Sequence, residues 1–232
     1  MNSINKNNSS LVQQKNELGF IVFEGIEACG KTTQIQLLAK RLKDECKITP
    51  LILREPGGTD IGEEIRKILK STDYQNNMCN ETELLLMNAA RAQLVREVIQ
   101  PALLKGQPIL CDRYYFSTLA YQGYGRGLPM RSLREITKYA IGNIQPQVVI
   151  FLDIPLEVSL ERIQSRNKFL RDQGLEIKDR FEESGKTFFE RVHQGFQELA
   201  NEFPLIKKIN ANQSIEKVGN EVWMTIQQLL GK

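Results

Sequence analysis

Eight consecutive residues, GIEACGKT at positions 25–32, have the spacing of a loop that binds phosphate groups. They follow the apolar stretch IVFE and lead into KTTQIQLL, which is typical of a helix. Two glycines let backbone N–H groups turn toward phosphate oxygens, and the helix points its partly positive end the same way. A lysine there reaches the β- and γ-phosphates, and a threonine offers its hydroxyl to Mg²⁺. The pattern predicts an ATP or GTP site formed by Gly25, Ile26, Glu27, Ala28, Cys29, Gly30, Lys31, Thr32 and Thr33.

Because motors, switches and kinases share such a loop, other residues must decide the function. In LILREPGGTDIGEEIR, Arg54 ends an apolar run before a Pro-Gly-Gly turn, which places it at the carboxyl edge of a sheet, where ligands bind. In ELLLMNAARAQLV, Met87 and Arg91 lie one helical turn apart and form an apolar contact beside a planar donor. Taken alone, this second segment fits a core methionine beside a surface arginine better.

A third segment, ILCDRYYFSTLAYQGYGRG, has the composition of a binding pocket. At the end of its apolar run, Asp112 can hold Mg²⁺ through water opposite the loop threonine, and Arg113 can grip an acceptor phosphate with two parallel hydrogen bonds. The aromatic and amide groups that follow suit a nucleobase, although the tyrosines can also simply pack on the sheet. These groups are Tyr114, Thr118, Tyr121 and Gln122.

Five short apolar runs, separated by amphipathic stretches, must position these residues. Runs that are apolar on both faces predict buried parallel strands joined by right-handed helical crossovers. We therefore expect an α/β fold of three layers, with a doubly wound, five-stranded parallel sheet. The expected strands are Gly19–Glu24, Lys47–Leu53, Gln107–Cys111, Gln147–Leu152 and Pro204–Asn210, and the expected helices are Lys31–Asp44, Ile61–Lys70, Thr82–Leu104, Leu156–Arg166, Glu182–Asn201 and Ile215–Leu230.

The stretch Asn167–Arg180 differs from its surroundings, since it mixes charges of both signs with a glycine and lacks steady periodicity. We interpret it as a mobile flap, a lid over residues 166–181; the alternative is a solvated loop without a role. The polar residues 1–17 are expected to form a disordered tail, and residues 18–232 a single domain.

The composition excludes several classes of protein and of binding partner. With 232 residues, 41% hydrophobic and 25% charged, the chain has the make-up of an ordinary globular protein, and a net charge of +3 predicts neither a nucleic-acid nor a membrane partner. Its single histidine, His193, excludes a histidine-rich metal site. Four cysteines without a CxxC pair, and no long apolar run, predict a soluble, cytoplasmic protein.

Together, GIEACGKTT, LREPGGT, the AAR helix, CDRYYFSTLAYQGYGRG and DRFE make the chain similar to bacterial-type thymidylate kinases. The resemblance spans residues 19–230 and is most specific at REPGGT and between DRY and YQG. It implies a homodimeric P-loop kinase with the nucleoside monophosphate kinase-like fold. Such an enzyme transfers the γ-phosphoryl group of ATP to dTMP with Mg²⁺, giving dTDP and ADP, in dTTP biosynthesis.

The resemblance also implies roles for individual residues around the phosphate and sugar of dTMP. Arg54 and Arg113 would hold the phosphate, and Tyr121 would crowd the sugar against a ribose hydroxyl. The acidic residue of the loop, Glu27, would lie near the 3′-hydroxyl and orient the phosphate-binding arginine. Phosphoryl transfer to a phosphate oxygen needs no general base, because the acceptor is already an anion.

At the base, the resemblance implies that Arg91 and Gln122 face the thymine edge and that Thr118 completes the contacts. The family usually presents a phenylalanine to stack on thymine, but this chain has Met87. A thioether can cover a ring but provides no π-stack, so this departure removes the stacking contribution to base affinity.

The phosphate loop and lid carry further departures from the family. Ala28 stands where glycine is usual and Cys29 where alanine is usual; if position 28 needs a positive φ, alanine costs about 1 kcal/mol. Since the loop has no arginine, the lid must supply a catalytic one, and Arg166, Arg171 and Arg180 compete for that role. The implied catalytic residues are Glu27, Lys31, Arg113, Arg166 and Arg180, with Arg162 at the ATP and Thr32 and Asp112 at the metal.

Two other functions remain open at this stage. A deoxynucleoside kinase acting on thymidine would use Glu55 as its base, although it would need no phosphate clamp. A P-loop ATPase that acts as a switch would hydrolyse ATP without any acceptor.

Overall fold

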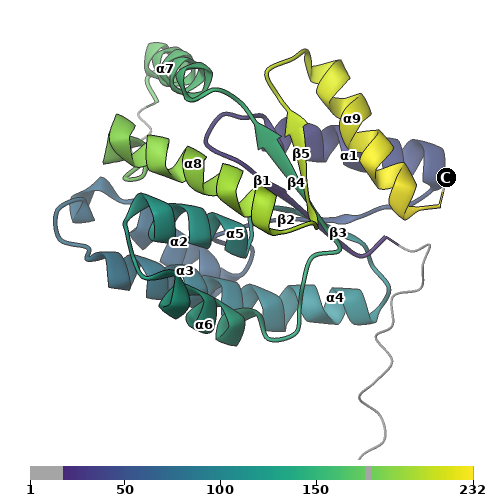
Figure 1. Ribbon diagram of the computed structural model, residues 1–232, viewed down its shortest axis with the longest axis horizontal. Coiled ribbons are helices and arrows are strands. Elements are labelled where there is room, and N and C mark those ends of the chain that lie inside the picture. The colour runs from purple at the N-terminus through teal and green to yellow at the C-terminus, as the bar shows by residue number, and fades with distance from the viewer. Residues whose placement is uncertain (1–17, 176–178, 232) are drawn as a thin grey trace, which may run out of the picture.

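The computed structural model describes residues 18–175 and 179–231 of the chain (Figure 1). Its centre is a sheet of five parallel strands in the order β2-β3-β1-β4-β5, so the expected doubly wound α/β fold is confirmed. The predicted polar tail, residues 1–17, lies outside the described residues. The strands are β1 (Phe20–Glu24), β2 (Leu51–Arg54), β3 (Ile109–Asp112), β4 (Val148–Asp153) and β5 (Ile206–Asn210).

The register of the three strands β2, β3 and β1 brings their carboxyl ends together. Asp112 of β3 pairs with Phe23 on one side and with Arg54 on the other. All five residues of β1 are buried, whereas exposed and half-buried residues alternate along β2 at the edge. The continuous apolar run of the central strand therefore reflects burial on both faces.

Helices cover both faces of the sheet. In Figure 1, α1 (Lys31–Cys46) and α9 (Ile215–Leu229) lie side by side on one face, and the remaining helices except α7 gather on the other. The helices on this second face are α2 (Asp60–Lys70), α3 (Asn80–Leu94), α4 (Gln100–Leu104), α5 (Tyr115–Thr118), α6 (Met130–Ile141) and α8 (Lys186–Glu202). The helix that lies apart, α7, spans Leu156–Asp172.

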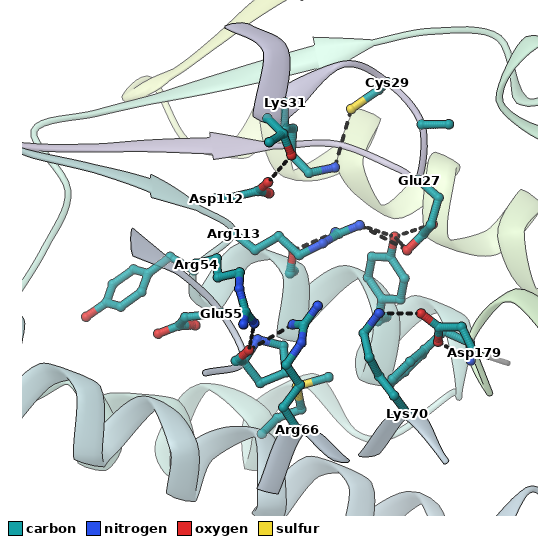
Figure 2. A pocket seen from close by; sticks show the side chains of 18 of the residues that line it. Glu27, Cys29, Lys31, Arg54, Glu55, Arg66, Lys70, Asp112, Arg113 and Asp179 are labelled. Carbon is teal, nitrogen blue, oxygen red and sulfur yellow. Dashed lines mark hydrogen bonds and ion pairs between the residues drawn. The ribbon is translucent and has the colours of Figure 1, made fainter. Parts of the chain in front are cut away.

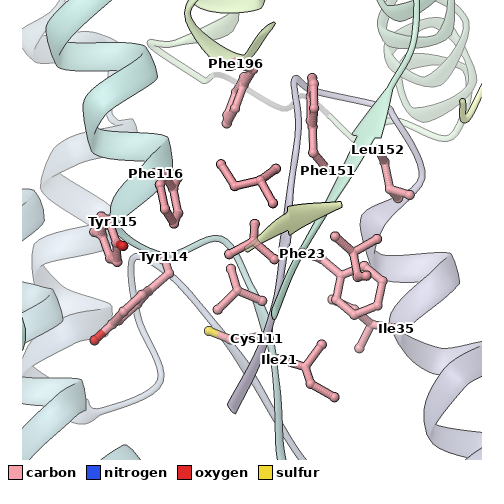
Figure 3. Packing of buried hydrophobic residues seen from close by; sticks show 14 of the residues in the cluster. Ile21, Phe23, Ile35, Cys111, Tyr114, Tyr115, Phe116, Phe151, Leu152 and Phe196 are labelled. Atoms are coloured by element: carbon pink, nitrogen blue, oxygen red, sulfur yellow. The ribbon is translucent and has the colours of Figure 1, made fainter. Parts of the chain in front are cut away.

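The core is formed where the sheet meets these helices (Figure 3). Phe151 of β4 stacks on Phe196 of α8 with ring centroids 5.4 Å apart, while Phe23 and Ile35 fill the space toward α1. Burial of such side chains stabilises a fold by about 1.5–3 kcal/mol each. This packing fixes the strand ends from which the site residues project.

Two helical segments depart from regular α-helix. The predicted helix Thr82–Leu104 is continuous, but a π turn at Val95–Ile99 joins α3 to α4. Pro101, which has no N–H to donate, lies just after this turn and accounts for the shifted pattern. A second π turn, Leu119–Gly125, continues α5 and was not expected from the sequence, nor was α6.

The sequence interpretation of the flap was wrong at its first residues. Asn167–Asp172 continue α7, with the Arg171 side chain bonded to the carbonyl of Asn167, because good helix formers extend the helix without an apolar stripe. Similarly, α8 begins at Lys186 and not at Glu182, since Gly185 has a φ of 84° that interrupts the helix. Lid residues 176–178 lie outside the described part of the chain.

Within the described ranges, no helix is long and apolar enough to cross a membrane.

Candidate active site

A cavity of about 470 Å³ lies at the carboxyl ends of β1, β2 and β3 (Figure 2). Most residues that the sequence singled out line it together, although they come from distant segments. Those that do are Glu27, Ala28, Cys29, Gly30, Lys31, Thr32, Thr33, Arg54, Met87, Arg91, Asp112, Arg113, Thr118, Tyr121, Gln122 and Arg166. Five others are absent from its lining: Gly25, Ile26, Arg162, Arg171 and Arg180.

The loop between β1 and α1 has the geometry that phosphate binding needs. Gly25 has a φ of 141°, and a Cβ there would come within 2.6 Å of the Leu152 carbonyl oxygen, so a side chain is excluded. Gly30, with a φ of 98°, ends the loop before α1. The buried Lys31 Nζ lies 3.0 Å from the carbonyl oxygens of both Gly25 and Ile26, which holds the ammonium group inside the loop.

Ala28 in the same loop has a φ of 54°. Position 28 therefore has the positive φ at which alanine is less favourable than glycine. Its carbonyl accepts a hydrogen bond from the exposed Arg162 of α7 at 3.2 Å, so this arginine lies against the loop even though it does not line the cavity.

Thr32 and Asp112 meet beside the loop, where the threonine hydroxyl donates to Asp112 Oδ2 at 3.0 Å. A hydroxyl and one carboxylate at the edge of a phosphate site fit Mg²⁺, which keeps several waters and takes few protein ligands. No group of three or more potential metal ligands (His, Cys, Asp, Glu) occurs among the residues that the structure describes.

Arg113 follows β3 with a φ of 71° and turns its guanidinium back toward the loop (Figure 2). It donates to the Gly25 carbonyl at 3.1 Å and to Glu27 at 2.9 Å, so the expected contact between Glu27 and Arg113 is present. Tyr121 donates to the same carboxylate at 2.6 Å. Burial alone would lower the pKa of Arg113, but Tyr121 and Glu27 raise it, so the guanidinium stays charged.

A buried carboxylate supports this arrangement from below. Glu24, at the end of β1, accepts hydrogen bonds from the backbone N–H groups of Tyr114 and Ser117 and from the Ser117 hydroxyl. Burial raises the pKa of Glu24, and these hydrogen bonds offset part of that effect. Ser117 in turn accepts from Arg113 at 3.0 Å, so Glu24 holds the turn that carries the arginine.

The turn after β2 adds two arginines to the cavity. Arg54 forms an ion pair with Glu63 at 2.9 Å, and Gly57 leaves the space in which these side chains meet. Arg66 of α2 donates to the Pro56 carbonyl at 2.8 Å and lies next to Arg54 (Figure 2). Burial, followed by the neighbouring Arg54, lowers the pKa of Arg66.

Sequence reasoning missed Arg66, along with other residues that line the cavity. A signal was available, because Arg66 and Lys70 lie one helical turn apart directly after the REPGGT turn. The further residues that it missed are Pro56, Lys70, Ser117, Asp179, Phe181 and Glu182. Tyr114, which the sequence offered as a group for a nucleobase, and Glu55, which it offered as the base of the alternative kinase, also line the cavity.

At the far end of the cavity, Arg91 is buried against the wall. It pairs with Glu55 at 2.8 Å and also donates to Asn88, Thr118 and the Tyr114 carbonyl. The expectation that Arg91 offers a free planar donor to the base is therefore corrected, since all three of its guanidinium nitrogens donate to protein acceptors. Because Thr118 accepts from Arg91, its own hydroxyl proton remains for another partner.

Glu55, the partner of Arg91, is itself buried and has one oxygen, Oε1, without a hydrogen-bond partner among the described residues. Burial raises the pKa of Glu55 to about 7, and the attraction of Arg91 lowers it only in part. Half of this carboxylate is thus engaged, and its other oxygen is unmatched.

Of the three lid arginines, only Arg166 reaches the cavity, where it pairs with Glu182 at 2.6 Å. Arg171 is exposed and bonds to its own helix. Arg180 is 3% exposed and donates to Glu83 at 2.6 Å and to the Leu69 carbonyl. In this conformation Arg180 is not placed to be catalytic, contrary to the expectation. Its guanidinium is hydrogen-bonded to Glu83 and to the Leu69 carbonyl, outside the cavity.

The phosphate loop after the first strand, the parallel strand order and an arginine-lined cavity beside the loop define a P-loop protein with the nucleoside monophosphate kinase-like fold. A family model described as thymidylate kinase matches residues 23–222. The chain belongs to the thymidylate kinase family.

Relatives and a solved structure agree with this assignment. A thymidylate kinase from Syntrophotalea carbinolica is 44% identical over 91% of this chain and 96% of its own length, and one from Legionella pneumophila (strain Paris) is 39% identical over 90% and 94%. The crystal structure of thymidylate kinase from Ehrlichia chaffeensis superposes with a TM-score of 0.69 at 28% identity, covering 91% of this chain and 99% of that one. The chain is therefore an enzyme of the kinase class, and neither alternative function is favoured.

Proposed function

We propose that this chain transfers the γ-phosphoryl group of ATP to dTMP, giving dTDP and ADP for dTTP biosynthesis in the cytoplasm. One observation carries the proposal: Arg54, Arg66 and Arg113 line the same cavity as the phosphate loop. A nucleoside acceptor would present no charge to these arginines, whereas a monophosphate would.

The acceptor phosphate lies between Arg113 and Arg66, with Arg54 at its outer side. Guanidinium groups bind a phosphate through paired hydrogen bonds, and the pairing of Arg113 with Glu27 directs it before substrate arrives. Tyr121, whose hydroxyl donates to Glu27, closes the sugar end of the cavity. Met87, Thr118 and Gln122 face the base.

The reaction requires alignment more than proton transfer. An oxygen of the dTMP phosphate attacks the γ-phosphorus of ATP while the bond to the β-phosphate oxygen breaks, and the acceptor oxygen is already an anion. Lys31, held inside the loop, meets the charge on the transferred group. No side chain has to remove a proton, which agrees with a cavity rich in arginine.

A magnesium ion fits the same site, where Thr32 and Asp112 would hold it together with ATP. When bound, it neutralises charge on the phosphates of ATP. The Thr32–Asp112 hydrogen bond keeps both oxygens at the edge of the loop in the meantime.

The lid, residues 166–181, supplies the further positively charged side chain that the reaction needs. Arg166 is the lid arginine in the cavity, and Glu182 holds it there. With Arg162 against the loop, it provides positive charge on the side of the cavity that no P-loop arginine covers. Closure of this segment over both nucleotides would exclude water and suppress hydrolysis.

The active form is a homodimer in this proposal, without a nucleic-acid or membrane partner. Large apolar side chains remain exposed on α3 and on the two helices that contact it, α2 and α6. Exposed apolar side chains on neighbouring helices support association of two copies. The side chains are Ile61, Ile68, Leu85 and Tyr139.

An ADP-release assay with a panel of acceptors tests the proposal. We expect ADP formation to need both ATP and dTMP, and thymidine to be inert at the same concentration. Thymidine turnover would point to the deoxynucleoside kinase, and ATP hydrolysis that is unaffected by dTMP would point to the switch protein. Either result would reject the proposed function.

A further inference from the structure

Glu83 of α3 is a buried carboxylate that does not line the cavity, yet it is bonded to a residue that does. It is 1% exposed and accepts from Gln122 Nε2 at 2.8 Å through Oε1. Arg126 donates to both of its oxygens, and Arg180 donates to Oε2 at 2.6 Å. One side chain thus ties the base end of the cavity to Arg180, near the C-terminal end of the lid.

The two arginines hold the Glu83 carboxylate in a fixed orientation. Arg126 lies over the ring of Phe188, 4.2 Å from its centroid, and Arg180 lies over Phe181 at 4.7 Å. Arg180 is also bonded to the Leu69 carbonyl at 3.0 Å. Because both guanidinium groups are anchored elsewhere, the carboxylate between them cannot turn away from Gln122.

This contact decides which way the amide of Gln122 faces. A carboxylate paired with two guanidinium groups only accepts hydrogen bonds, so the NH₂ group of Gln122 must face Glu83. Its carbonyl oxygen, Oε1, therefore faces away from Glu83. Since Gln122 lines the cavity beside Met87 and Thr118, the structure offers an oriented acceptor at the base end.

We propose that Glu83 is a positioning residue that sets base selectivity, by holding Gln122 so that Oε1 accepts the N3–H of a thymine or uracil ring. The inference rests on the proposed function, which supplies the pyrimidine monophosphate. In cytosine, N3 carries a lone pair and would meet Oε1 without a hydrogen. An amide turned the other way would present N–H and would accept cytosine, so the orientation itself is the selective element.

The test measures kcat/KM for three acceptors, dTMP, dUMP and dCMP, in wild type and in Glu83→Gln. The new amide can present either its oxygen or its NH₂ to Gln122, so the orientation is no longer imposed. We expect the ratio of kcat/KM for dTMP to that for dCMP to fall about 10-fold or more. The ratio of dTMP to dUMP should not change, because both bases carry N3–H. If Glu83 had a purely structural role, its replacement would lower kcat/KM for dTMP, dUMP and dCMP alike.

Three further variants make the test independent of folding. Glu83→Asp keeps the charge between the two guanidinium groups but withdraws the acceptor from Gln122, and should lower the dTMP to dCMP ratio in the same direction. Arg126→Lys keeps the Gln122 contact and should retain the ratio. In a Gln122→Met background, Glu83→Asp should have no additional effect on the ratio.

An unchanged dTMP to dCMP ratio in both Glu83 variants, or an equal loss for dTMP, dUMP and dCMP, would overturn the inference. An additional loss of the ratio in the Gln122→Met background would overturn it as well, since Glu83 would then act by another route. Failure of the proposed function would look different, because wild type would then not phosphorylate dTMP at all.

Discussion

At the scale of single residues, Ala28 gives the simplest prediction, because its φ of 54° lies in the region that favours glycine. Ala28→Gly should raise the free energy of unfolding by about 1 kcal/mol, measured by urea denaturation. Ala39→Gly, within helix α1, is the matched control and should lower it by about the same amount. Equal destabilisation by both changes would show that the alanine in the loop is not strained.

Cys29 in the same loop is a second residue-scale prediction. Its sulfur lies 3.4 Å from Lys31 Nζ and lines the cavity, so a group attached to it would occupy the space of the phosphates. Modification by iodoacetamide should abolish turnover, and ATP should protect. A Cys29→Ala variant should keep its own activity through the same treatment, although the exposed Cys79 still reacts. Mass spectrometry that shows full modification of Cys29 with no loss of turnover would contradict close phosphate approach there.

The sequence predicted site residues well where they are contiguous and poorly where their partners are distant. The phosphate loop could be found because its spacing alone encodes the geometry. The partners of Arg91 and Arg180 could not be predicted, because these arginines pair with Glu55 and Glu83, which lie 36 and 97 residues away along the chain. A guanidinium looks the same in sequence whether it faces a substrate or a buried carboxylate.

At the scale of elements, β2 and α2 each contribute an arginine to the acceptor end, and their surroundings predict unequal effects. Arg66 is half-buried and bonded to the Pro56 carbonyl, whereas the Arg54 side chain is 47% exposed and already paired with Glu63. Arg66→Met should raise the KM for dTMP roughly 10- to 100-fold, as loss of a charge-assisted hydrogen bond does. Arg54→Met should raise it less, with the KM for ATP little changed in either variant. Equal KM values for dTMP in Arg66→Met and wild type would remove Arg66 from the phosphate clamp.

Elements were predictable where burial imposes a pattern. The three inner strands, β1, β3 and β4, appear as apolar runs because they are buried on both faces of the sheet and cannot carry charge there. The end of α7 could not be found this way, because its last turns are exposed and have no apolar stripe, so helix and flap have the same composition. The π turns depend on local hydrogen bonding after β3 and near Pro101, which composition does not express.

At the scale of the whole molecule, the exposed apolar side chains of α2, α3 and α6 predict the oligomeric state. Leu85 is 56% exposed and Tyr139 is 88% exposed. Leu85→Arg should convert the dimer to a monomer in sedimentation velocity, since a charge would be buried against an apolar surface. Met224→Arg, on the exposed side of α9, is the control and should leave the dimer intact. A wild-type monomer at all accessible concentrations would contradict the proposed homodimer.

The pH dependence of global stability follows from Glu55. Its pKa is raised by burial from its ordinary value of 4.5 to about 7, so the folded protein binds this proton more tightly than the unfolded chain does. The stabilisation is therefore fully present below pH 4.5 and is lost as the pH rises through 7. Glu55→Gln has no such proton, and its NH₂ group can occupy the place of the unmatched Oε1 while its oxygen still accepts from Arg91.

Between pH 4.5 and 8, the unfolding free energy of wild type should therefore fall relative to that of Glu55→Gln, by up to roughly 3 kcal/mol. Urea denaturation of both proteins across this window measures the difference. Other titrating groups are common to both proteins and cancel. They include Glu63, whose pKa is lowered by the backbone N–H of Gly58, and Asp153, whose pKa burial would raise but the hydrogen bonds from His193 and Lys208 lower. Two parallel stability curves would mean that Glu55 titrates alike in the folded and unfolded states, and a gap that widens in favour of wild type would mean that its pair with Arg91 outweighs burial.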